Sequence, residues 1–80
     1  PPEEIQAALL LVVHRGLARD RQAAVALAAR SLGFRSLTVR TRTALEEQLA
    51  GLLRRGKLVI HGARLETGSA PNAPLMQASA

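Results

Sequence analysis

Three glycines divide most of the sequence into segments whose apolar residues recur at helical spacing. Gly16, Gly33 and Gly56 each follow such a segment. Glycine adopts the left-handed conformation that commonly ends an α-helix, because it has no Cβ to clash with the neighbouring backbone. The pattern therefore predicts three helices that end at these glycines, and 80 residues leave room for one small domain.

The first two helices are predicted from their apolar faces and their ends. In the first helix the apolar residues recur at i, i+4, i+7 and i+8, namely Ile5, Leu9, Val12 and Val13. Asp20 follows a short connection and has the side-chain oxygen that caps a second helix. We expect Leu17 to return to the core after the first helix. We expect Phe34, the only aromatic residue, to anchor the second helix to the third.

The third helix is predicted over residues 39 to 55. Its inner face follows the leucines from Leu45 to Leu53, and Val39 and Thr41 continue their spacing. Residues 43–46 form a capping box of their own, so a later start at Thr43 is the alternative. We favour the earlier start.

A short β-hairpin is predicted after Gly56. Residues 57–61 alternate and are β-branched, Gly62-Ala63 makes a turn, and residues 64–66 pair back. Leu58, Ile60 and Leu65 are expected to face inward. Three helices followed by a hairpin are the α+β arrangement of a winged helix, a helix-turn-helix core with a β-hairpin wing, in which Leu17-Ala18 would form the stub of a further strand. A plain three-helix bundle is the alternative.

The folded domain is predicted over residues 1–66 and a disordered tail or linker over 67–80, where two prolines and no charges occur. The chain opens on Pro1 without a methionine, which is typical of a fragment of a longer protein. The longest apolar run, residues 7–13, is too short for a membrane span, and no signal peptide is visible, so we expect a cytoplasmic protein without a membrane partner.

Several function classes are excluded or disfavoured by composition. Without cysteine the chain has no disulfide, no thiol nucleophile and no cysteine-ligated zinc site. His14 and His61 are far apart in sequence and lack clustered carboxylates, so no metal and no cofactor are expected. No serine has a nearby histidine and acid, so we expect no enzyme activity in this chain.

The arginines favour nucleic acid as a partner. Eleven Lys and Arg against six Asp and Glu give a net charge of +5, which favours phosphate binding. The predicted contacts lie around the third helix and on the hairpin: Arg35, Arg40, Arg42, Thr43, Arg54, Lys57, His61 and Arg64. Glu46 and Glu47 interrupt this surface. In the alternative interpretation, Arg40, Glu47 and Arg54 form a solvated ion-pair face.

The sequence also resembles a known family. Gly33-Phe34-Arg35, residues 40–46, Gly56-Lys57-Leu58 and Gly62 are similar to a small winged-helix domain near the C-terminal end of large bacterial proteins that combine superfamily-1 helicase motifs with a restriction-endonuclease-like module. The resemblance covers residues 5 to 66. It departs at Thr41, where an aliphatic residue is usual, and at Arg64, where the wing usually has an aromatic residue. The resemblance implies a parent protein that acts on DNA.

Two functions follow as hypotheses. The first is a nucleic-acid-binding accessory module of a helicase- or nuclease-like protein, which contacts the backbone of duplex or forked DNA. The second is a protein-interaction module that packs the first helix or the wing against the remainder of the parent protein or a second copy, and that does not bind DNA. The surplus leucines of the first helix, Leu10 and Leu11, leave the second hypothesis open.

Overall fold

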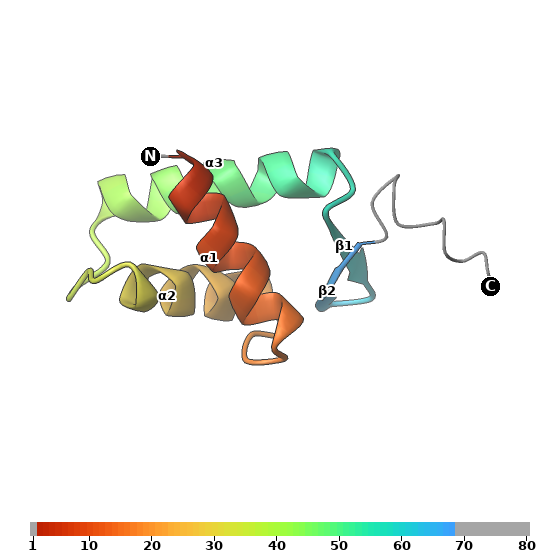
Figure 1. The fold of residues 1–80 in the computed structure, drawn as a ribbon. Coiled ribbons are helices and arrows are strands. Elements are labelled where there is room, and N and C mark those ends of the chain that lie inside the picture. Colours follow the sequence, from red (N-terminus) through yellow and green to blue (C-terminus); the bar gives the residue numbers. More distant parts are fainter. Residues whose placement is uncertain (1, 69–80) are drawn as a thin grey trace.

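The computed structural model describes residues 2–68, which form three helices and one antiparallel hairpin (Figure 1). The elements are α1 (Pro2–His14), α2 (Arg21–Ser31), α3 (Val39–Arg54), β1 (Leu58–His61) and β2 (Arg64–Thr67). The predicted order of elements and the α+β class are confirmed. No helix in this part of the chain is both long and apolar enough to cross a membrane.

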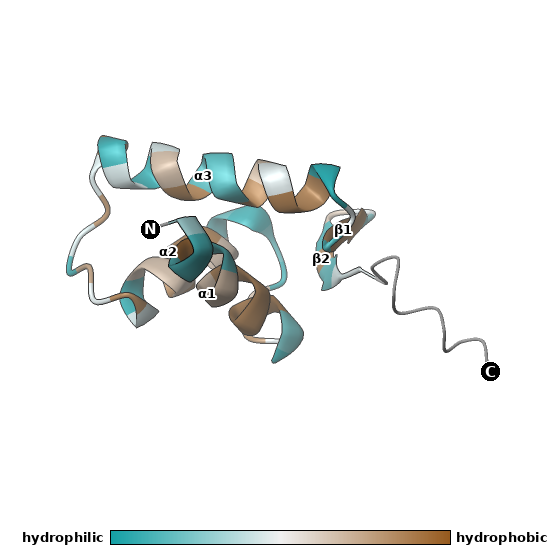
Figure 2. Cartoon of the chain, turned by 45° about the horizontal axis from the view of Figure 1, so that its top comes forward, coloured by the Kyte–Doolittle hydropathy of each residue, from teal (hydrophilic) through white to brown (hydrophobic). Residues whose placement is uncertain are grey.

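The core lies where α1 crosses α2 and α3, and the hairpin closes one end of it (Figure 1). Its largest fully buried side chains are Leu9, Val25, Leu45, Leu49, Leu52 and Leu58. Figure 2 shows the corresponding pattern, with hydrophobic residues turned inward and the hydrophilic residues of α3 turned away from the other helices. No polar or charged side chain among the described residues is buried. Apolar packing therefore holds this fold together.

Small residues on α2 allow the helices to approach closely. Ala24 and Ala28 are fully buried, and Ala29 is nearly so. The side-chain Nε2 of Gln6 on α1 donates a hydrogen bond of 2.7 Å to the side-chain Oε1 of Gln48 on α3. This bond joins residues far apart in sequence and adds a polar contact to the apolar packing of α1 on α3.

The predicted helix ends are confirmed. Gly33 has φ of +95° and donates to Arg30, while the Phe34 N–H donates to the Ala29 carbonyl, which is the Schellman pattern. The same pair of bonds ends α1 at Gly16 and α3 at Gly56. Side-chain capping sets the starts of α2 and α3.

Asp20 accepts a hydrogen bond from the Ala23 N–H at 2.8 Å and so caps α2 as predicted. Thr38 accepts from the Thr41 N–H at 3.2 Å and caps α3, which confirms the earlier of the two predicted starts. The second capping box, at Thr43, lies inside α3 and begins no helix.

Three side chains that were predicted to be inward are exposed. Val39 is 81% exposed because it lies about 120° around α3 from Leu45, at 100° per residue, and so leaves the buried stripe. Leu17 is 61% exposed, and Ala18 fills the core position beside it. Phe34 is 46% exposed and is not among the partly buried residues packed against the core. The prediction that it anchors α2 to α3 is wrong.

The hairpin has the predicted turn and pairs Ile60 with Leu65. Leu58 and Leu65 are buried as predicted, but Ile60 is 42% exposed, because it lies near the hairpin tip beyond the helices that cover Leu58. No strand forms at Leu17-Ala18, although the Leu65 N–H donates to the Arg19 carbonyl at 2.7 Å. That single bond takes the place of the predicted strand stub.

The folded region extends slightly beyond the predicted boundary at residue 66. β2 includes Thr67, and the Gly68 N–H donates to the Lys57 carbonyl at 2.9 Å. Both residues were assigned to the tail by sequence, because Thr-Gly resembles the linker composition that follows. The remainder of the predicted tail, 69–80, lies outside the described residues.

Candidate nucleic-acid interface

The turn between α2 and α3, together with the start of α3, gathers half of the predicted contact residues. Arg35 lies in the turn, Arg40 and Arg42 lie in the first turn of α3, and Thr43 follows them. All four are exposed. We call this group the cationic end. It surrounds a helix N-terminus, where the helix dipole and free backbone N–H groups favour an anion.

Carboxylates approach the cationic end in sequence only from its C-terminal side, where Glu46 and Glu47 follow Thr43 by three and four residues. Between Asp20 and Glu46 the chain contains Arg21, Arg30, Arg35, Arg40 and Arg42 and no Asp or Glu. The only salt bridge among residues 2–68 joins His61 to Glu66, so these guanidinium groups are not paired with carboxylates. The alternative of an Arg40–Glu47–Arg54 ion-pair face is not borne out in this structure. The guanidinium groups remain available to bind phosphate oxygens.

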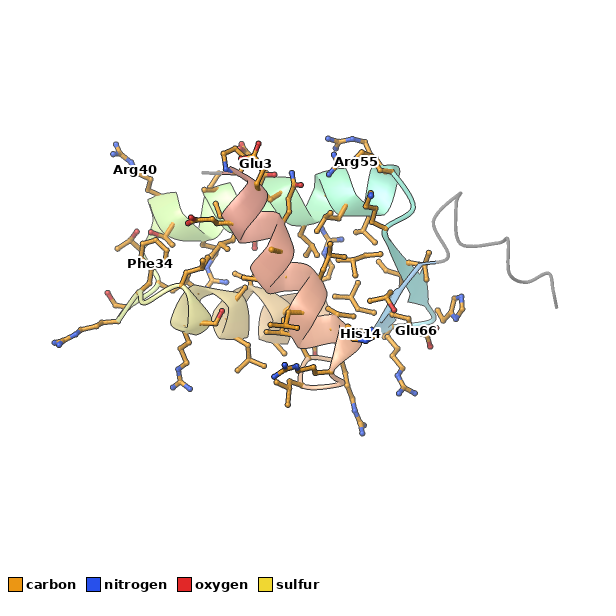
Figure 3. The ribbon with its side chains drawn as sticks, in the orientation of Figure 1. Glu3, His14, Phe34, Arg40, Arg55 and Glu66 are labelled. Atoms are coloured by element: carbon orange, nitrogen blue, oxygen red, sulfur yellow. The ribbon has the colours of Figure 1, made fainter. Side chains whose placement is uncertain are left out.

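The outer face of α3 extends this charge along the helix. Figure 3 shows Arg40 and Arg55 on the side of α3 that points away from the rest of the fold, near opposite ends of the helix. Arg54 is exposed beside Arg55. Sequence reasoning missed Arg55, although its position 15 residues after Arg40 places it about 60° from Arg40 around the helix. Glu47 lies between the two ends and makes the middle of this face unfavourable for phosphate.

Gly51 lies on this outer face under the arginine side chains. A Cβ added to it would lie 3.2 Å from Arg55 Nη1 and 3.6 Å from Arg54 Nη2, both ends of flexible side chains. Alanine is more favourable than glycine inside a helix by about 0.8–1 kcal/mol. The guanidinium groups can move by a few tenths of an ångström to make room.

We therefore expect Gly51→Ala to stabilise the domain by about 0.5–1 kcal/mol, which raises Tm by roughly 2–8 °C for a domain of this size. Thermal unfolding followed by circular dichroism measures the change. The exposed helical variant Ala44→Ser is a matched surface control and should move Tm slightly downward. A lower Tm for Gly51→Ala would show that the arginines over Gly51 cannot move.

The hairpin contributes a second, weaker cluster. His61 and Arg64 face each other across the strands and are exposed, but Glu66 lies on the same face. His61 Nδ1 is 3.0 Å from Glu66 Oε1. Glu66 therefore occupies one ring nitrogen of His61, a contact that sequence reasoning did not foresee. Lys57, directly after the cap of α3, is exposed and has no salt-bridge partner among the described residues.

A polar hollow of about 270 Å³ lies between the end of α1 and β2. Its lining includes His14, Arg19, Arg64 and Glu66. Arg19 was not predicted as a contact residue, because only the bond from Leu65 to the Arg19 carbonyl brings its connection beside β2. The strand stub predicted at Leu17-Ala18 pointed to this part of the chain but not to Arg19 itself.

The eight predicted residues therefore do not form one continuous site. Arg35, Arg40, Arg42 and Thr43 lie at the start of α3, whereas Arg54, Lys57, His61 and Arg64 lie at or beyond its other end. A helix of 16 residues separates the two groups by about 24 Å. The chain thus offers two positive regions, one at the start of α3 and one at its end and on the hairpin. Among the described residues no three His, Asp or Glu gather as a metal site would require.

Comparisons of the whole chain with family models, with curated proteins and with solved structures found no match in any of the three.

Proposed function

We propose that the chain is a winged-helix domain that binds the DNA backbone as an accessory module of a larger helicase- or nuclease-like protein. The observation that carries the proposal is the cationic end: exposed arginines, unpaired with any described carboxylate, around the capped N-terminus of α3. The order of three helices and a hairpin supports the winged-helix assignment. The parent's activity on DNA rests on the resemblance of residues 5 to 66.

The charges favour backbone contacts over the reading of a long base sequence. Arginine binds phosphate oxygens bidentately, and the Thr43 hydroxyl supplies a further donor at the same end. Glu47 and the small residues Ala44 and Gly51 occupy the middle of the outer face of α3, where a recognition helix would need donors for base edges. The wing, with Lys57 and Arg64, then provides a second phosphate contact on duplex or forked DNA.

The charge test is the double substitution Arg40→Ala with Arg42→Ala. We expect it to weaken binding to a short labelled duplex about tenfold at low salt, because two phosphate contacts are lost. The slope of log K against log salt concentration should fall by about 2, at 0.9 for each contact. Fluorescence anisotropy at about 50 mM and about 200 mM salt measures both quantities.

The matched control is Arg15→Ala with Arg21→Ala, which removes the same charge from exposed positions outside the cationic end. We expect it to change the affinity by about twofold or less. An equal loss in both double variants would show that net charge alone attracts DNA and would contradict an interface at the start of α3. Absence of DNA binding by the wild type at low salt would refute the proposal.

One observation favours the second candidate function, protein docking. Leu11 on α1 and Leu17 just after it are 46% and 61% exposed, and Leu10 beside them is only partly buried. Such side chains are suited to contact with the remainder of the parent protein or with another copy. This candidate would gain support if the wild type fails to bind DNA and if Leu11→Ser disrupts association with a protein partner.

A further inference from the structure

Phe34 is the residue whose placement most needs a functional explanation. It is the only aromatic residue of the chain, and nearly half of its surface is exposed. A single exposed apolar residue is ordinary in proteins. However, Val39, five positions later, is 81% exposed, so two large apolar side chains lie beside the turn that holds Arg35 and Arg40.

The backbone holds Phe34 in a fixed position. Its N–H donates to the Ala29 carbonyl at 3.0 Å, and Gly33 before it takes the left-handed conformation that completes the cap of α2. Figure 3 shows Phe34 and Arg40 at the same end of the molecule, away from the hairpin. The backbone of Phe34 is thus fixed at the end of one helix beside the start of another, so only the side chain needs to be ordered when the ring contacts a ligand.

The charge around the ring identifies the chemistry of the ligand. From residue 30 to residue 45 the chain has four arginines and no carboxylate, which favours a ligand with an apolar group between two negative charges. A nucleobase flanked by phosphates has this character, and bases stack on aromatic rings. In paired duplex the faces of the bases are covered by their neighbours. An unpaired base that can turn its face to a protein ring occurs where a duplex opens into a single strand, whereas a blunt end exposes only the outer face of its terminal base pair.

We propose that the Phe34 ring stacks on an unpaired base at the junction of duplex and single-stranded DNA, while Arg35 and Arg40 hold the phosphates on either side of it. This inference rests on the proposed DNA-binding function and names its substrate class as forked DNA. Stacking of one base on an aromatic side chain corresponds to an affinity gain of about five- to one-hundredfold. The wild type should therefore bind a fork more tightly than a blunt duplex of the same length, by about tenfold.

The absence of tryptophan and tyrosine allows a direct optical test. Phe34→Trp introduces the only tryptophan, and a base stacked on it quenches its fluorescence. We expect strong quenching when forked DNA is added and weak quenching with blunt duplex. The matched control is Val39→Trp, which places the same fluorophore at the same end of the molecule, in an exposed position that the proposal does not assign to stacking. It should be quenched much less by the fork.

A binding experiment gives a second readout. Phe34→Leu keeps an apolar side chain but removes the ring, so we expect it to lose the roughly tenfold preference for the fork and keep its affinity for blunt duplex. Circular dichroism before titration identifies any variant that does not fold, and the two tryptophan variants test the proposal without Phe34→Leu.

The outcomes separate this inference from the proposed function. If wild type binds DNA but the fork does not quench Phe34→Trp, or quenches Val39→Trp equally, the stacking proposal is overturned and DNA binding through the arginines stands. Equal affinity of the wild type for fork and blunt duplex overturns it as well. If the wild type binds neither DNA at low salt, the proposed function itself fails.

Discussion

Replacing Leu49 by alanine is expected to destabilise the domain by about 2–5 kcal/mol. Leu49 is fully buried in the core where α1 crosses α3, so the substitution removes apolar contacts and leaves a cavity. A chain of 80 residues has a total stability of roughly 4–12 kcal/mol. The loss is therefore a large part of the total, and the variant should be substantially unfolded near physiological temperature.

Urea denaturation followed by circular dichroism measures this effect, with a fall in the midpoint and no change in the slope m. The matched control is Val39→Ala, an aliphatic truncation on the same helix at a position that is 81% exposed. It should change the free energy of unfolding by about 0.5 kcal/mol or less. Similar losses in the two variants would mean that α3 presents a different face to the core.

The helices were predictable because their signals are local. A capping side chain such as Asp20 and a glycine such as Gly33 act within one turn, so their bonds form wherever the helix forms. Whether a side chain at the end of a helix or strand points inward depends instead on neighbouring elements that are distant in sequence. Val39 and Ile60 were predicted inward from spacing, and Leu17 from its place just after the first helix; all three are exposed at the margins of the core. Spacing does not show where the neighbouring elements stop.

In the candidate site, too, the features that depend on local sequence were predictable and those that depend on tertiary contacts were not. The sequence identified Arg40 and Arg42 because charges near a helix start can be placed from the helix boundaries alone. It did not show that Glu66 lies 3.0 Å from His61, because that contact depends on the register of the hairpin. Nor did it show that Phe34 is exposed, because a hydrophobic contact accompanies a Schellman cap often but not always.

Replacing Gly68 by alanine is the second substitution with a large expected effect. A Cβ at this position would overlap the backbone carbonyl oxygen of Gly56 and lie 3.3 Å from Val59 Cγ1. The Gly56 carbonyl cannot easily move, because the Gly56 N–H donates to Leu53 and the Lys57 N–H donates to Leu52 in the cap of α3. The end of β2 must therefore shift, which breaks the bond from the Gly68 N–H to the Lys57 carbonyl.

We expect Gly68→Ala to cost about 1–3 kcal/mol of stability, the range for an inserted methyl group that the surroundings cannot accommodate. Thermal unfolding measures the loss, and amide hydrogen exchange should show faster exchange at the open end of the hairpin than in α1 or α2. The control is Thr67→Ala, the exposed neighbour, which should stay within about 0.5 kcal/mol of the wild type. The change in stability is opposite in sign to that expected for Gly51→Ala. The added methyl group meets backbone atoms at Gly68, whereas at Gly51 it meets only the ends of flexible arginine side chains. If both glycine variants stabilise the domain, Gly68 does not pack against Gly56, and the folded region ends nearer the boundary at residue 66 that its composition predicts.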